Sequence, residues 1–97
     1  MPKAYIVSCY RSISDPEKLA AYAKLSGPAF APFGARYLAL GKAAAAYEHG
    51  LKERLVIVEF PSLEQAIAAR ESPAYAEALK ALGDGAERDF RIIEGLE

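Results

Sequence analysis

The sequence of 97 residues contains no tryptophan, asparagine or threonine, and it has one cysteine and one histidine. Without asparagine, every mechanism in which an asparagine side chain orients a water molecule or holds an oxyanion is excluded. The lone cysteine, Cys9, cannot form an intramolecular disulfide and excludes a cysteine-rich metal site. Because His49 is the only histidine and no helical Glu-x-x-His spacing is present, we expect no metal centre.

An excess of one charge sign and long apolar runs are also missing. Twelve basic residues stand against thirteen acidic ones, for a net charge of −1. Nucleic-acid binders usually present a basic face, so we expect no nucleic-acid partner. No apolar run approaches the roughly 18 residues needed to span a bilayer, so we expect no membrane partner. Met1-Pro2-Lys3 leads directly into a strand-like segment that is too short and too polar for a signal peptide, so we expect none. The expectation is therefore a soluble, cytoplasmic protein with one domain over residues 1–97.

Local patterns predict four strands and two helical regions. Asp15-Pro16 is typical of a helix start, Gly27-Pro28 should kink or break that helix, and Gly34 should end it. Ser62 begins a second helix, which a new start at Ser72-Pro73 divides into two pieces. β-branched and aromatic stretches predict strands at residues 4–10, 35–40, 55–60 and 89–94.

The order strand, helix, strand, strand, helix, strand determines the fold class. Right-handed crossovers place both helical regions on the same face of a four-stranded antiparallel sheet. We therefore predict an α+β protein with the ferredoxin-like βαββαβ arrangement and its helices on one face.

Both faces of the predicted sheet carry apolar side chains. In the first strand Val7 faces one way and Ile6 the other, and Ile57 and Val58 repeat this in the third strand. Two helices cover only one face, and an exposed apolar face of this size favours association. We therefore predict a homodimer that packs sheet against sheet.

Short motifs at matching spacing support a family resemblance. They are Asp15-Pro16, the run from Phe33 to Leu38, Glu59-Phe60-Pro61-Ser62, Ser72-Pro73 with Tyr75, and Ile93-Glu94-Gly95. In this order they resemble the domain of unknown function 1330 family of the dimeric α/β-barrel superfamily. The resemblance implies a dimer whose two sheets form a barrel-like core. It implies no single reaction, because the superfamily includes cofactor-free monooxygenases and small isomerases. Two positions depart from the family pattern: Gly83, where an arginine is common, and His49.

His49 is the leading candidate for proton transfer, because it alone has an unperturbed pKa near neutrality. Together with its neighbour Glu48 it is a candidate catalytic group, a general base or a group that orients a substrate carbonyl. The alternative is a solvated histidine in a hairpin, since neighbours along a strand point to opposite faces.

Four further residues are candidates for ligand binding. Arg36 and Tyr37 project to opposite faces, and one of them should point into the cleft between helices and sheet, where an arginine can bind a carboxylate. The alternative for Arg36 is an ion pair with a surface acid. Glu59, within an apolar strand, must be paired, protonated or facing a cavity. The alternative is exposure at the end of the strand, beside Pro61. Tyr5 could line an aromatic pocket. Cys9 is expected to be a buried, inert side chain.

These observations predict a protein that holds a small organic molecule in the helix–sheet cleft. If it is an enzyme, we expect cofactor-independent oxygenase or isomerase-like chemistry with no bound cofactor. The alternative is a non-catalytic homodimeric binding or regulatory module.

Overall fold

The four predicted strands form one antiparallel sheet. The computed structural model describes residues 2–96. The sheet has the order β2-β3-β1-β4, so the two central strands are β1 and β3. The strand bounds are Ala4–Ile13 for β1, Arg36–Lys42 for β2, Arg54–Phe60 for β3 and Ala86–Glu94 for β4. The predicted strands were correctly placed, but β1 ends three residues later than predicted and β4 begins three residues earlier.

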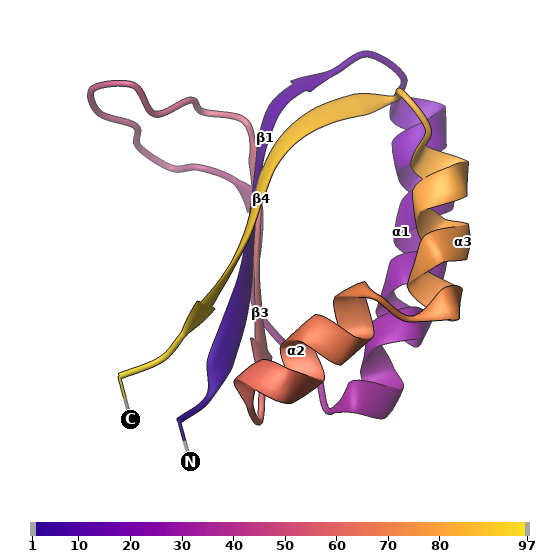
Figure 1. Ribbon diagram of the computed structural model, residues 1–97. Coiled ribbons are helices and arrows are strands. Elements are labelled where there is room, and N and C mark those ends of the chain that lie inside the picture. Colours follow the sequence, from indigo (N-terminus) through magenta and orange to yellow (C-terminus); the bar gives the residue numbers. More distant parts are fainter. Residues whose placement is uncertain (1, 97) are drawn as a thin grey trace.

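All helices lie on one face of the sheet, as Figure 1 shows. Their bounds are Pro16–Phe30 for α1, Leu63–Arg70 for α2 and Pro73–Leu82 for α3, with a 3-10 turn, η1, at Ala31–Phe33. The Asp15 carboxylate accepts hydrogen bonds from two backbone amides at the start of α1. Ser62 and Ser72 cap α2 and α3 in the same way, so the predicted division near Ser72 is confirmed. The predicted ferredoxin-like arrangement is confirmed as well.

The predicted break at Gly27-Pro28 is not found, because α1 continues through both residues to Phe30. Pro28 lacks the amide that would bond to the carbonyl of Lys24, but it lies only two residues from the end of the helix. Phe30 is 3% exposed and stacks on Tyr75 with ring centroids 4.7 Å apart. This packing holds the last turn of α1 against the core.

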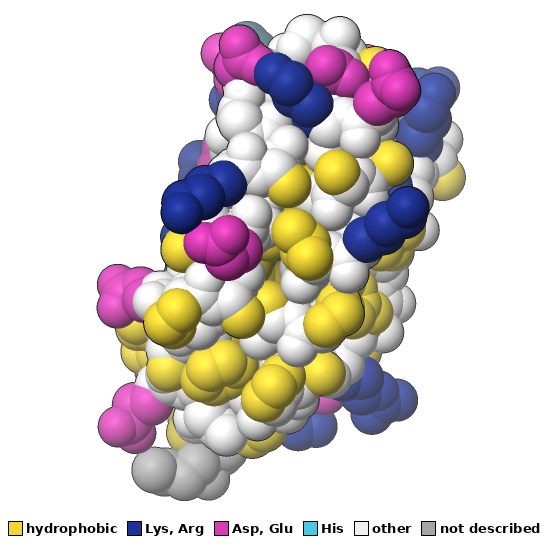
Figure 2. Space-filling model, turned by 90° about the vertical axis from the view of Figure 1, so that its right-hand side faces the viewer, with side chains coloured by type: hydrophobic (Ala, Val, Ile, Leu, Met, Phe, Trp, Pro, Cys, Tyr) yellow, Lys and Arg dark blue, Asp and Glu magenta, His cyan; other side chains and the backbone are white. Residues whose placement is uncertain are grey.

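The core lies between the helices and the sheet. In β1 the even-numbered residues Ala4, Ile6, Ser8 and Tyr10 are buried, and the intervening residues are less buried. The same alternation buries Val56, Val58 and Phe60 in β3. The outer surface of the helix layer has small hydrophobic side chains at its centre and charged ones around its edge (Figure 2). Within residues 2–96, no helix combines the length and apolar character that membrane crossing requires.

No layer formed by residues 2–96 covers the opposite face of the sheet, and we call this surface the open face. It is formed by the alternate side chains of the strands, among them Tyr5, Val7 and Ile57, which are half-buried, and Ile93, which is 59% exposed. Cys9 lies on this face and is exposed, so the prediction that it is buried is wrong. Its neighbours Ser8 and Tyr10 face the core instead. The long connection between β2 and β3 projects from the side of the sheet that carries the open face (Figure 1).

Candidate functional site

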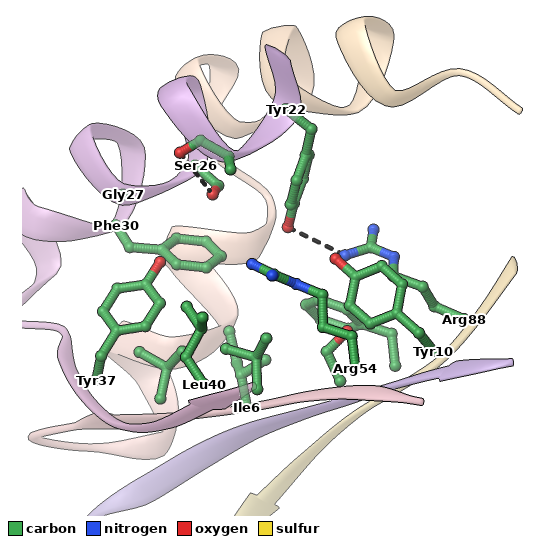
Figure 3. Close-up of a pocket in the computed structure, with 15 residues that line it drawn as sticks. Ile6, Tyr10, Tyr22, Ser26, Gly27, Phe30, Tyr37, Leu40, Arg54 and Arg88 are labelled. Atoms are coloured by element: carbon green, nitrogen blue, oxygen red, sulfur yellow. Dashed lines mark hydrogen bonds between the residues drawn. The ribbon is translucent and has the colours of Figure 1, made fainter. Parts of the chain in front are cut away.

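A cleft of about 260 Å³ lies between α1 and the sheet (Figure 3), and we call it the helix–sheet cleft. Every strand and one helix contribute to its walls. The lining residues are Ile6, Ser8, Tyr10, Tyr22, Ala23, Ser26, Gly27, Phe30, Tyr37, Leu40, Arg54, Val56, Val58, Arg88 and Phe90.

An irregularity in β2 brings two of its side chains into this cleft. Tyr37 pairs with Val58 and Leu40 pairs with Val56, although residues three apart on a regular strand face opposite ways. The register shifts between Tyr37 and Ala39, which leaves Leu38 as an extra residue. The bulge therefore turns both Tyr37 and Leu40 toward α1.

Arg88 and two tyrosines form a hydrogen-bonded group at the wall of the cleft. The guanidinium of Arg88 donates from Nη1 to the Tyr22 hydroxyl oxygen at 3.0 Å. The hydroxyls of Tyr22 and Tyr75 share a buried hydrogen bond of 2.6 Å. The Arg88 guanidinium also lies 4.9 Å from the centroid of the Tyr22 ring and 5.1 Å from that of Phe90. These contacts fix the position of Arg88 without a carboxylate.

Two buried polar atoms of the cleft lack a partner among the described residues. They are the Ser8 hydroxyl oxygen, on a residue only 4% exposed, and the Arg54 Nε. Arg54 extends from β3 into the space beneath α1 (Figure 3). Its guanidinium carbon lies 5.8 Å from the Tyr10 ring centroid. Buried polar atoms are nearly always hydrogen-bonded, so Ser8 and Arg54 have unused hydrogen-bonding capacity at the wall of the cleft.

Two tyrosines of the cleft, Tyr22 and Tyr37, have a pKa above the ordinary value. Burial raises the pKa of Tyr22 above its ordinary value of 10.0, and the nearby Tyr75 raises it further. Burial also raises the pKa of Tyr37. For Arg88, burial lowers the pKa, but the interactions with Tyr22 and Tyr75 outweigh this and the net pKa is raised. The polar part of the cleft is therefore cationic, with neutral hydroxyls around it.

A second hollow of about 480 Å³ adjoins the β2–β3 connection, and we call it the hairpin recess. His49 and Tyr47 line it from the connection, and Cys9 and Asp89 line it from β1 and β4. Tyr10 and Arg54 line both hollows, so the recess and the cleft share one wall.

The six residues that the sequence singled out are spread over the molecule. Tyr37 lines the helix–sheet cleft and His49 lines the hairpin recess. Glu48 has a positive φ of 55° and lines neither hollow. The remaining three, Arg36, Tyr5 and Glu59, lie on the open face.

The three candidate ligand-binding residues on the open face do not line the helix–sheet cleft. Glu59 lies 3.5 Å from the ammonium group of Lys3, so it is paired, one of the alternatives that its position in an apolar strand left open. Arg36 stands opposite Glu59 in the β2–β3 register. Tyr5 pairs with Ile93 in the register with β4. One of Arg36 and Tyr37 was predicted to point into the cleft; Tyr37 is the one that lines it, and the alternation of β2 turns Arg36 away from α1.

The arginines that do face the cleft, Arg54 and Arg88, were missed because each lies one residue before the start of its predicted strand. β3 begins at Arg54, and strand alternation then puts Arg54 in phase with Val56 and Val58. β4 begins at Ala86, which puts Arg88 in phase with Phe90. The sequence signal for both arginines was the alternation of inward-facing and outward-facing side chains, continued beyond the apolar part of each strand.

Comparisons with known proteins agree with the fold. A family model described as "Domain of unknown function (DUF1330)" matches residues 3–96. No curated protein matches the sequence. A solved protein of unknown function from Rhodopseudomonas palustris has a TM-score of 0.77 and 19% identity, covering 99% of this chain and 84% of that chain.

Two further solved structures show the same fold at lower similarity. A dimeric ferredoxin-like protein of unknown function from Thermobifida fusca has a TM-score of 0.64 and 16% identity, covering 96% of this chain and 91% of that chain. SnoaB, a cofactor-independent oxygenase from Streptomyces nogalater, has a TM-score of 0.62 and 11% identity, covering 100% of this chain and 96% of that chain. At such identities the likeness shows the fold alone.

Proposed function

This chain belongs to the DUF1330 family, and we propose that it is a homodimeric protein that binds a small organic molecule in the helix–sheet cleft. The observation that carries the proposal is the pair of buried atoms without partners, Ser8 Oγ and Arg54 Nε. They lie among mostly apolar and aromatic walls. Apolar walls with a few convergent polar groups are typical of small-molecule sites. A ligand in the cleft would satisfy both atoms.

The dimer half of the proposal rests on the open face. Half-buried Val7, Leu55 and Ile57 and exposed Ile93 form an apolar surface that the helix layer does not cover. The Thermobifida fusca protein with the same fold is dimeric, which supports a second copy of this chain as the partner. The open faces of two copies would then pack against each other, and the β2–β3 connections would lie beside the interface.

Binding without acid–base catalysis is the function that the cleft supports best. Among the described residues, none that lines the cleft is His, Asp, Glu, Lys or Cys. Proton transfer near neutral pH most often uses such a group, and the raised pKa values of the cleft residues Tyr22 and Tyr37 oppose the loss of their protons. His49 lies in the hairpin recess instead. We therefore favour the non-catalytic binding or regulatory module.

A cofactor-independent oxygenase is the second candidate. It is favoured by the fold shared with the Streptomyces nogalater oxygenase and by the Arg88–Tyr22 pair, which could stabilise a developing oxyanion in the cleft. His49 would contribute only if a substrate reached from the cleft into the adjoining recess. Oxygen consumption with a cleft ligand as substrate separates this candidate from simple binding.

A thermal-shift screen of small metabolites tests the binding proposal. Ala23→Phe places a large side chain at an exposed position that lines the cleft, and Ala21→Phe makes the same change at an exposed position of α1 outside it. We expect compounds that stabilise the wild type and Ala21→Phe but not Ala23→Phe. Compounds that stabilise all three proteins equally would show that the ligand binds elsewhere. Including His49→Ala reports whether the recess takes part.

A further inference from the structure

Two guanidinium groups approach the helix–sheet cleft, and none of the described lining residues is acidic. Arg54 and Arg88 both lie within 6 Å of the centroid of the same ring, that of Tyr10. Neither takes part in any of the salt bridges found within residues 2–96. All five of those ion pairs use other basic side chains.

An arginine without a carboxylate partner is unusual in a largely apolar site. A partly buried positive charge is costly unless hydrogen bonds or an opposite charge compensate it. Arg88 is compensated in part, through its hydrogen bond to the Tyr22 hydroxyl and the three aromatic rings around it. Arg54 makes one cation–π contact, with the Tyr10 ring, and its buried Nε has no partner among the described residues. Among the described residues, the cleft therefore lacks a negatively charged group that would balance Arg54 and Arg88.

We propose that the ligand of the cleft is a small organic anion, an aromatic carboxylate held by Arg54 and oriented by Ser8 and Arg88. The inference rests on the proposed function and adds the chemical class of the ligand. Guanidinium groups bind carboxylates through paired, charge-assisted hydrogen bonds, and the Arg54 Nε is one such donor left free. The Ser8 hydroxyl can donate another.

The walls of the cleft match the rest of such a ligand. Phe30, Tyr37 and Leu40 lie together at the end of the cleft away from Arg88 (Figure 3). Their apolar parts give an aromatic ring of the ligand a surface on which to pack. A volume of about 260 Å³ admits one or two fused rings with a carboxylate.

The test compares two probes that differ only in charge, 2-naphthoate and 2-naphthamide. Binding to the full chain is measured by NMR titration, with the backbone amides of Ser26, Gly27 and Tyr37 reporting on the cleft. We expect the carboxylate to bind at least tenfold more tightly than the amide. Arg54→Gln should reduce carboxylate affinity about tenfold or more, while Arg54→Lys should retain part of it. Arg36→Gln removes the same charge from the open face and should leave the affinity unchanged.

Each outcome decides between the two proposals. Equal affinity for carboxylate and amide, with shifts at the cleft amides, overturns the anion inference and leaves the binding function standing. No shift at the cleft amides with either probe counts against the binding function itself. An equal loss of affinity in Arg36→Gln and Arg54→Gln would mean that net charge, and not the cleft, attracts the anion. Melting temperatures of the variants show whether a loss of binding is a loss of folding.

Discussion

Tyr75 is among the largest fully buried side chains of the molecule, and its hydroxyl is tied to that of Tyr22 at 2.6 Å. The two rings meet edge to face with centroids 5.9 Å apart. Tyr22 in turn accepts from Arg88. The chain of contacts therefore runs from the centre of the core to the polar wall of the cleft, and it makes Tyr22 the link between stability and binding.

Removing the two hydroxyls one at a time should have unequal effects. Tyr75→Phe deletes one hydrogen bond and should lower the free energy of unfolding by about 1 kcal/mol. Tyr22→Phe leaves both the Arg88 guanidinium and the Tyr75 hydroxyl without this partner, so it should cost about 1–3 kcal/mol. Urea unfolding at one protomer concentration measures both. A larger loss for Tyr75→Phe than for Tyr22→Phe would contradict the arrangement.

The raised pKa of Tyr22 and Tyr37 gives the protein a predicted alkaline limit. Burial favours the neutral phenols, so the folded state keeps these protons at a pH where the unfolded chain loses them. Stability from this source is complete below the ordinary tyrosine pKa of 10.0 and falls as the pH rises above it. Urea unfolding as a function of pH should show this fall, with a shallower slope in Tyr22→Phe. An identical slope in the two proteins would refute the contribution of Tyr22.

At the scale of elements, the turn from η1 into β2 depends on a glycine. Gly34 has a φ of +82°, a conformation that residues with a side chain rarely adopt. A Cβ there would also lie 2.8 Å from Cγ of Pro61. The turn and the start of α2 thus fit together only because position 34 has no side chain.

Two Gly→Ala changes should therefore shift stability in opposite directions. Gly34→Ala should lower the free energy of unfolding by about 1–3 kcal/mol, through the strained φ and the overlap with Pro61. Gly27→Ala lies inside α1, where a Cβ meets nothing within 4 Å, and should raise it by about 0.5–1 kcal/mol. Calorimetric melting of the two variants provides the comparison. Destabilisation by Gly27→Ala would show that α1 is strained where it passes Pro28.

The order and type of the elements could be predicted from the sequence, because each has a strong local signal. The caps at Asp15, Ser62 and Ser72 marked the helix starts, and the run from Leu55 to Phe60 marked a central strand. The ends of β1 and β4 could not be predicted, because Arg11 and Arg88 give no β signal of their own. Strand pairing with a neighbour extends them.

Of the residues that the sequence predicted for the cleft, Tyr37 lines it, but the two arginines of the cleft were not predicted. The helix–sheet cleft follows from the topology, which the sequence determines well. Its arginines sit just beyond the apolar runs, where a sequence pattern cannot tell a strand residue from a loop residue. The bulge at Leu38, which turns Leu40 inward, has no sequence signal.

At the scale of the whole molecule, the open face predicts a dimer. Light scattering at micromolar concentration should give twice the chain mass of 10.5 kDa. Ile57→Lys places a charge in the open face and should produce a monomer. Ile67→Lys makes the same change at an exposed position of α2 and should remain dimeric. A wild-type mass of 10.5 kDa would contradict the dimer.

The central claim is that the helix–sheet cleft holds a small organic anion, and a crystal structure grown with 2-naphthoate tests it most directly. The account predicts density for the naphthyl ring against Phe30 and Leu40, with a carboxylate oxygen within hydrogen-bond distance of Arg54 Nε and Ser8 Oγ. Density for the ligand only on the open face or in the hairpin recess, with the cleft holding none, would contradict it.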